Sequence, residues 1–313
     1  MNEKCQRSDT QQIHAGGPLR LWARLLRTHG GIDRCFLRRA AFVWLTCAIT
    51  FPVRLAERAI YGRRIRATPI TSPPIFILGH WRSGTTFLHN LVSRDSQFGT
   101  ISCLQIAAPD AYLLSDRVLR VLLTRFVKPT RPMDDVPMPV DSPQEEEFSM
   151  AKVSPHSFYH AWTFPRQSQY YFDKYVLFRD LLPAERTEWE DAYMGILKKA
   201  TMSAGGKPLL LKSPVNMGRI GAILKLFPDA RFIHVYRNPY AVFASARHLH
   251  QRALQLFQVQ STDDTSIEAN VLRQYRKLMS AFLADRKLIP EGNLVELKFE
   301  DLRAAPLREL HRI

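Results

Sequence analysis

Cysteine is scarce in this sequence and follows no pattern. The 313 residues contain four cysteines, Cys5, Cys35, Cys47 and Cys103, and no two of them form a CxxC pair. Such scattered cysteines indicate neither a zinc site nor a disulfide framework, and they suit a reducing compartment. We therefore expect a cytoplasmic protein that needs no metal ion.

Long uninterrupted apolar runs are also missing. The uncharged stretch of residues 40–53 is shorter than the ~20 residues that a membrane-spanning helix needs, and Pro52 interrupts its end. The residues before this stretch are polar and basic, so no secretory signal is evident. The sequence therefore favours neither a spanning helix nor export.

Acidic residues are outnumbered by basic ones, 29 against 44, which gives a formal net charge of +15 at pH 7. This excess predicts an anionic partner such as a nucleotide or a membrane surface. No zinc-finger spacing or RNP-like aromatic motif accompanies it, so we expect no nucleic-acid partner. Arginines gather on both sides of the apolar stretch, at Arg20, Arg24, Arg27, Arg34, Arg38, Arg39, Arg54, Arg58, Arg63, Arg64 and Arg66. The segment reads as a helix that either lies on an anionic membrane surface or packs its apolar face on the rest of the chain.

The organisation changes at residue 73 to alternating strands and helices. Short apolar runs predict buried strands at residues 75–78, 209–211, 232–236 and 294–299, and helical spacing follows the first three. Such alternation predicts a mostly parallel sheet with helices on both faces. The predicted fold class is therefore α/β, a three-layer sandwich whose ligand site lies beyond the carboxyl ends of the strands.

Two regions follow from this change. Residues 1–72 are expected to form a helical N-terminal appendage, and residues 73–313 one α/β domain with a largely helical and loop insertion at residues 103–183. Five prolines in residues 129–143 argue against regular structure there. Amphipathic spacing predicts two long helices, at residues 184–202 and 266–289.

An anion-binding loop is expected where the first strand meets its helix. Residues 79–86 read Gly-His-Trp-Arg-Ser-Gly-Thr-Thr, and the backbone N–H groups of such a loop bind phosphate in front of a helix dipole. The spacing is similar to the ATPase loop GxxxxGK[ST] and indicates a P-loop-type fold, but a threonine stands in place of the lysine and an arginine lies three residues earlier. The expected anion-binding residues are Arg82, Ser83, Gly84, Thr85 and Thr86.

A second strand-to-helix turn carries another pair of polar residues. Arg237 follows the strand at residues 232–236, and Ser245, eight positions later, lies on the first turns of the next helix. Together the two motifs resemble sulfotransferases that use 3′-phosphoadenosine 5′-phosphosulfate (PAPS), of the broad bacterial-type branch. In that family an Arg/Lys-Ser-Gly-Thr-Thr loop holds the 5′-phosphosulfate, and an arginine and a serine eight residues apart hold the 3′-phosphate. Lys212, in Leu-Lys-Ser-Pro, and Phe299, in Phe-Glu-Asp-Leu, extend the resemblance.

The resemblance implies transfer of a sulfuryl group from PAPS to a hydroxyl of an unidentified small-molecule, lipid or carbohydrate acceptor. Arg237 and Ser245 would bind the 3′-phosphate, while Arg82 and Lys212 would stabilise charge on the leaving phosphate oxygen. Relatives generally continue beyond Ile313, which implies a shortened C-terminal segment. Two alternatives stay open: a P-loop nucleotide kinase or NTPase, and a non-catalytic, membrane-associated nucleotide-binding remnant.

The general base that accepts the acceptor's proton is less clearly marked. Cytosolic relatives have a histidine two positions after the lysine, where this chain has Pro214. The tyrosylprotein relatives use a glutamate instead, but residues 98–109, where it would be expected, contain no Asp or Glu. Residues 145–147 are three adjacent acids. Crowding is a general way to raise the pKa of a carboxyl toward the value that a base needs, although the helix dipole alone favours acids in a first turn. The candidates, in order, are Glu145 and Glu147, then Glu146, then His156 and His160.

Overall fold

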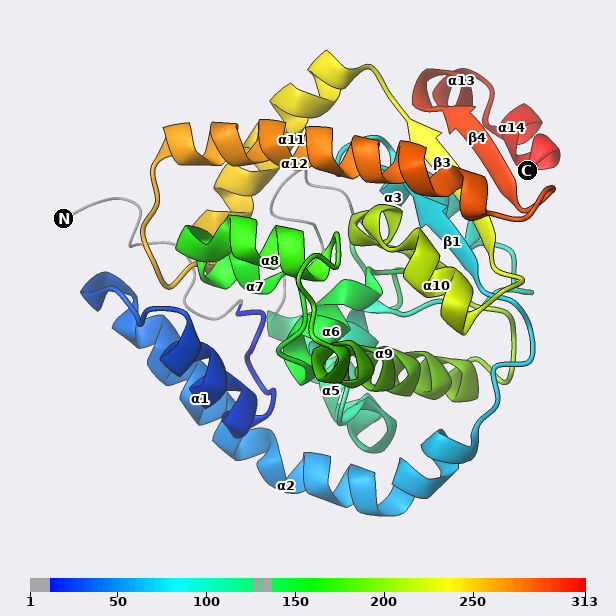
Figure 1. The fold of residues 1–313 in the computed structure, drawn as a ribbon. Helices are drawn as coiled ribbons and strands as arrows, with labels where there is room; N and C mark the ends of the chain where they lie inside the picture. Colours follow the sequence, from blue (N-terminus) through cyan, green and yellow to red (C-terminus); the bar gives the residue numbers. More distant parts are fainter. Residues whose placement is uncertain (1–11, 127–129, 131–136) are drawn as a thin grey trace.

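The computed structural model describes residues 12–126, 130 and 137–313, and a four-stranded sheet lies at their centre (Figure 1). The strand order is β2-β1-β3-β4, and every pairing is parallel. The strands are β1 (Ile75–Leu78), β2 (Leu210–Lys212), β3 (Arg231–Tyr236) and β4 (Leu294–Lys298). The predicted α/β class with a parallel sheet is confirmed.

Helices of the described chain connect these strands. Two helices precede β1, namely α1 (Leu19–Thr28) and α2 (Leu37–Ala67). Between β1 and β2 lie α3 (Thr85–Val92), α4 (Cys103–Ala107), α5 (Tyr112–Phe126), α6 (Glu146–Val153), α7 (His160–Thr163), α8 (Ser168–Tyr175) and α9 (Pro183–Ser203). After β2 come α10 (Ile220–Leu226), α11 (Pro239–Phe257), α12 (Asp264–Asp285), α13 (Phe299–Ala304) and α14 (Pro306–Arg312).

Both faces of the sheet are covered, because successive strand side chains point to opposite faces and both sets are apolar. On one face Ile77 and Ile233 share a core cluster with Leu88 of α3 and Leu302 of α13. On the other face Phe76 packs against Phe227, which follows α10, with ring centroids 6.4 Å apart. The predicted three-layer arrangement is therefore present.

The helix of the N-terminal segment continues through Pro52, the residue that interrupts the end of the apolar stretch in the sequence. Helix α2 runs from Leu37 to Ala67 with Pro52 inside it. A proline removes one N–H from a helix, and Pro52 lies on the exposed side, where water can satisfy the freed carbonyl. Residues on either side, Cys47 and Glu57, are buried against the rest of the protein, so packing holds the helix together through the proline.

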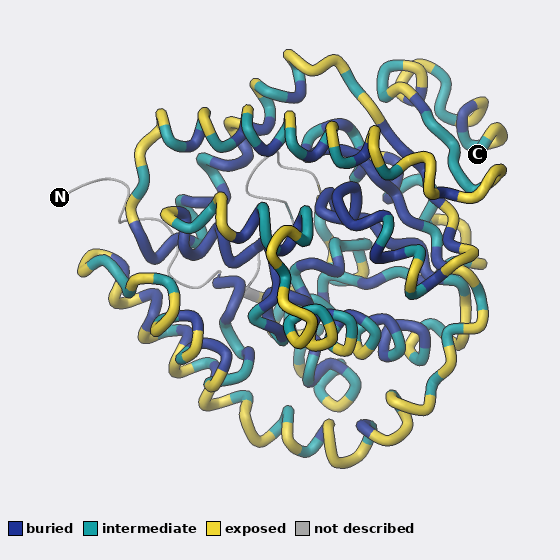
Figure 2. Tube along the Cα trace, viewed as in Figure 1, coloured by how far each residue is buried: buried dark blue, intermediate teal, exposed yellow. Residues whose placement is uncertain are grey.

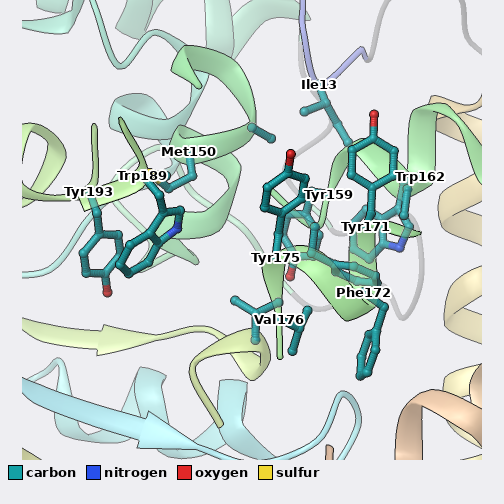
Figure 3. Close-up of a cluster of buried hydrophobic side chains, with 14 of the residues drawn as sticks. Ile13, Met150, Tyr159, Trp162, Tyr171, Phe172, Tyr175, Val176, Trp189 and Tyr193 are labelled. Atoms are coloured by element: carbon teal, nitrogen blue, oxygen red, sulfur yellow. The ribbon is translucent and has the colours of Figure 1, made fainter. Parts of the chain in front are cut away.

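The N-terminal segment packs into the same core as the sheet. Trp22, Phe36 and Val43 belong to the cluster that also contains Phe76, and Ile13 lies beside the aromatic side chains of the insertion (Figure 3). Buried Arg39 donates hydrogen bonds to the carbonyls of Gln255 (2.9 Å) and Gln258 (3.0 Å). The opposite side of α2 remains exposed along the rim of the molecule (Figure 2).

The proline-rich loop expected at residues 129–143 is only partly covered, since residues 129 and 131–136 lie outside the described ranges. Thr130 and Pro137 form an isolated antiparallel bridge, and Pro143 forms another with Ser102. Residues 138–142 contain neither helix nor strand. This described part therefore agrees with an irregular loop.

Candidate active site

The loop after β1 has the backbone of an anion-binding turn. Gly84 precedes the first residue of α3 and has a φ of +99°. A Cβ at this position would lie 2.0 Å from the Phe299 ring, so no side chain fits there. Arg82 has a φ of +72°, and a left-handed non-glycine residue costs about 1–3 kcal/mol, a strain that gathers at functional sites.

The two motifs recognised in the sequence meet in space. The Arg82 Nε atom donates a hydrogen bond to Ser245 Oγ at 2.8 Å, and Arg237 Nη1 donates to the Arg82 carbonyl at 3.2 Å. The Arg237 guanidinium lies 4.8 Å from the centroid of the Phe299 ring. The loop after β1, the turn after β3 and the residue after β4 therefore form one cationic site at the carboxyl edge of the sheet.

Lys212 and Glu145 form the next part of this site. The Lys212 ammonium donates to Glu145 Oε1 at 2.5 Å and to Thr86 Oγ1 at 3.3 Å. The Tyr159 hydroxyl donates to the other oxygen of Glu145, and burial raises the pKa of Tyr159 well above its usual value, so the phenol keeps its proton. Each oxygen of the Glu145 carboxylate thus has a fixed donor.

The other two acids of the cluster point elsewhere. Glu147 is fully buried, where its carboxylate pairs with Arg219 at 2.7 Å and accepts a hydrogen bond from Ser157 Oγ at 2.7 Å. Burial raises the pKa of Glu146 to about 7, and Asn216 donates to it. Neither carboxylate lines the cavity described below, so the structure brings only Glu145 to the cationic site.

Neither candidate histidine reaches this site. His156 Nε2 lies 2.8 Å from a carboxylate oxygen of Glu188. His160 Nε2 lies 2.9 Å from the Ser154 carbonyl, and burial holds the pKa of His160 well below its usual value. Both rings contribute to the packing of the insertion and do not line the cavity.

A cavity of about 600 Å³ opens beside the cationic site. Its polar part contains Arg82, Gly84, Thr85, Thr86, Glu145, Lys212 and Arg237. Its apolar part contains Ile13, Ala15, Ile106, Ala107, Leu123, Met138, Phe148, Trp162, Leu249 and Phe257. Charged groups at one part and aliphatic and aromatic groups at the other suit a polar reacting centre on a mainly apolar molecule.

Several lining residues have no signal in the sequence. Ile13 and Leu123, for example, come from segments with no motif. The hydrogen bond from Tyr159 to Glu145 joins residues 14 positions apart, on either side of α6. Tertiary packing alone brings these groups together.

No metal cluster is found among the residues that the structure describes. Groups of three or more His, Cys, Asp or Glu side chains close enough to hold an ion do not occur in these ranges. The cations that line the cavity are side chains, Arg82, Lys152, Lys212 and Arg237.

Comparison with known proteins identifies the class to which this fold and site belong. The family model described as "Sulfotransferase family" matches residues 73–313, so the chain belongs to the sulfotransferase family. It is a transferase that acts on sulfuryl groups, and a P-loop kinase or a non-catalytic remnant is not favoured.

Particular relatives extend the comparison beyond the matched region. The chain is 29% identical over 293 residues to omega-hydroxy-beta-dihydromenaquinone-9 sulfotransferase Stf3 of Mycobacterium bovis, covering 93% of this chain and 75% of the relative. The enzyme of the same name from Mycobacterium tuberculosis matches with the same identity and coverage. Both relatives carry the name of a sulfotransferase, in agreement with the family.

Two solved structures share the fold. Sulfotransferase STF1 from Mycobacterium tuberculosis H37Rv superposes with a TM-score of 0.71 at 19% identity, over 93% of this chain and 79% of that one. Sulfotransferase STF9 from Mycobacterium avium superposes with a TM-score of 0.70 at 20% identity, over 98% and 78%. The fold of the protein is therefore that of known sulfotransferases.

Proposed function

We propose that this sulfotransferase uses PAPS as its sulfuryl donor. The observation that carries the proposal is the convergence of Arg82, Ser245 and Arg237, with a 2.8 Å hydrogen bond between the first two. Arg237 and Ser245 bind the 3′-phosphate, and the loop from Arg82 to Thr86 binds the 5′-phosphosulfate through its N–H groups and the α3 dipole. In this assignment Arg82 connects the two phosphate positions.

The proposed chemistry needs one base and two cations. The acceptor hydroxyl attacks sulfur, its proton passes to Glu145, and the bond from sulfur to the 5′-phosphate oxygen breaks. Lys212 and Arg82 stabilise the negative charge that develops on the departing oxygen of 3′,5′-ADP. No step is assigned to a metal ion, and turnover is expected to survive thorough chelation.

In this proposal Lys212 is the ion-pair partner of Glu145 before the sulfuryl donor binds. The two side chains form a 2.5 Å ion pair, in which Lys212 is 4% exposed and Glu145 is 13% exposed. A carboxylate in such a position is stable only with a charge partner. A bound phosphosulfate competes for the lysine ammonium. The Glu145 oxygen that was bonded to the lysine is thereby released to accept a proton as the reacting complex forms. Glu147, held by Arg219 outside the cavity, has no part in this proposal.

The acceptor is proposed to be a lipid-like molecule with a free hydroxyl. The apolar part of the cavity, with Leu123, Phe148 and Trp162, suits a hydrocarbon chain or ring far better than a carbohydrate. The name of the Stf3 relative, which specifies an omega-hydroxylated menaquinone, supports the same chemical class. We further propose that the protein works on the cytoplasmic side of a membrane, touching its anionic surface with the N-terminal segment.

Isothermal titration tests the sulfuryl donor. We expect 3′,5′-ADP to bind tightly and ATP not to bind, because Thr85 replaces the lysine that a γ-phosphate site needs. Arg237→Gln is expected to weaken 3′,5′-ADP by at least about tenfold, since it removes a charge-assisted contact, and to leave 5′-AMP unchanged. Arg247→Gln is the control, because this exposed arginine of α11, the helix that follows Arg237, pairs with Glu268. Equal binding of ATP and 3′,5′-ADP would refute the assignment.

A further inference from the structure

The exposed face of α2 is apolar over several turns. From residue 41 to residue 55 the exposed side chains are Ala41, Trp44, Leu45, Ala48, Ile49, Phe51, Pro52 and Leu55. Their spacing of three and four residues places most of them on one stripe, and Ile49 is 65% exposed. Burying such a stripe releases about 25 cal/mol for each Å² of apolar surface, so this face is suited to a partner.

A second apolar stripe lies on the neighbouring helix α5. Its large exposed apolar side chains are Leu114, Val118, Val121 and Leu122, again three and four residues apart. The Leu114 N–H donates to Glu57 of α2 at 2.9 Å, which fixes the start of α5 against the second half of α2. Figure 1 shows α5 next to α2, which runs along the rim of the molecule.

Exposed charges around these stripes are mostly positive. The only acid within α2, Glu57, is buried against Lys199. The exposed arginines of the two helices and the turn before α2 are Arg34, Arg38, Arg58, Arg63, Arg64, Arg66, Arg117 and Arg125. Apolar side chains bordered by arginines match an anionic lipid surface, where each arginine contributes about 1 kcal/mol.

The helical stretch of residues 34–67 is long and apolar enough to cross a membrane, and 28% of its most apolar part is buried in the protein. Contacts on its inner side oppose crossing. Arg39 is bonded to carbonyls of α11, and Glu57 is paired with Lys199 of α9. These anchors hold both halves of α2 on the catalytic domain, so the helix lies along a bilayer surface without spanning it.

We propose that α2 and α5 together form one docking surface for an anionic bilayer. This inference rests on the proposed function and extends it, because α5 belongs to the catalytic domain. Leu123 of α5 lines the apolar part of the cavity, directly after the exposed Val121 and Leu122. Docking through α5 therefore brings the wall of the acceptor cavity to the lipid, where a lipid-like acceptor is dissolved.

Flotation with vesicles tests the surface, with phosphatidylglycerol in phosphatidylcholine compared with phosphatidylcholine alone. We expect the wild-type protein to float with the anionic vesicles. Ile49→Glu and the double variant Val118→Glu/Val121→Glu are each expected to lower binding about tenfold or more, because a charge replaces apolar surface. Leu283→Glu, on α12 and 58% exposed in the wild type, is the control and should bind as the wild type does.

The outcomes separate the two proposals. If the α5 double variant floats like the wild type while Ile49→Glu does not, α5 is not part of the docking surface. The further inference then fails, and the proposed membrane contact through the N-terminal segment is retained. If light scattering shows a dimer that these variants dissociate and no variant or wild type floats, a second copy covers the face and the docking proposal fails. Binding of 3′,5′-ADP, measured for every variant, reports the fold and the sulfuryl-donor site independently of membrane binding.

Discussion

At the scale of single residues, three consecutive glutamates have three different environments. Glu145 is bonded to Lys212 and Tyr159 at the cationic site. Glu146 is buried beside Asn216, and Glu147 is paired with Arg219. Because neighbouring residues at the start of a helix project in different directions, adjacency in the sequence does not give them a common role.

Replacing the proposed base is expected to separate chemistry from binding. Glu145→Gln should lower kcat by roughly 10²–10⁴, the usual contribution of a general base, while titration shows 3′,5′-ADP still bound. Glu188→Gln, an exposed carboxylate outside the cavity, serves as the control for kcat. Wild-type turnover in Glu145→Gln would eliminate this residue as the base.

The buried neighbour is expected to respond differently. Glu147→Gln leaves the Arg219 guanidinium without its charge partner at zero exposure, and breaking such a pair costs about 3–5 kcal/mol. Thermal unfolding should show the loss, whereas kcat of the protein that stays folded should remain near the wild-type value. A stable Glu147→Gln protein without turnover would instead show that Glu147 takes part in catalysis.

At the scale of elements, the N-terminal helices are joined to the catalytic domain by buried polar contacts. Arg39 is 1% exposed and donates to two carbonyls at the end of α11. Helix α11 also carries Ser245, so the anchor of α2 and part of the cationic site share one helix. The change of composition at residue 73 therefore does not divide the protein into two hydrophobic cores, because residues on both sides of it belong to one cluster.

Arg39→Met is therefore expected to lower the free energy of unfolding of the whole protein. The variant removes the guanidinium that donates to the Gln255 carbonyl and to the buried Gln258 carbonyl, and loss of the donor to a buried carbonyl costs about 1–3 kcal/mol. Arg38→Met is a matched control, because the adjacent arginine is exposed. Urea denaturation followed by tryptophan fluorescence and far-UV circular dichroism should give one transition. Two separate transitions would show that residues 1–72 unfold by themselves.

At the scale of the whole molecule, many buried histidines make stability depend on pH. Burial lowers the pKa of His14 and His89 to about 3 and that of His80 and His250 to about 4. In the unfolded chain a histidine titrates near 6.5. The unfolded state thus binds more protons between these values, and stability is complete above pH 6.5 and lost as pH falls toward 4.

We expect the melting temperature to decrease steadily between pH 7 and pH 4. Each buried histidine contributes up to roughly 1.4 kcal/mol per pH unit, and scanning calorimetry at constant ionic strength measures the sum. His14→Gln should flatten this dependence, and His248→Gln, which replaces an exposed histidine, should not. A melting temperature that stays constant to pH 4 would contradict the neutral buried state of these rings.

Much of the catalytic domain could be predicted because its signals are local. The apolar runs that became β1 and β3, and the polar turns after them, lie within a few residues of one another. Parallel strands bring such turns to one edge of the sheet, so the sequence predicts Arg82 and Arg237 in one site. The structure shows them in contact. The course of the N-terminal helix past Pro52 could not be predicted, since the inner contacts that hold the helix together on both sides of the proline involve distant residues.

The sequence by itself determined the class of fold, the family and the two turns that meet at the cationic site, because spacing along the chain is enough to specify a strand, a turn and a helix. Only the tertiary structure decided that Glu145, among three adjacent acids, meets Lys212, and that Ile13 and Leu123 share one cavity. The physical reason is that side-chain direction and long-range packing depend on all the elements at once, and no local pattern records them.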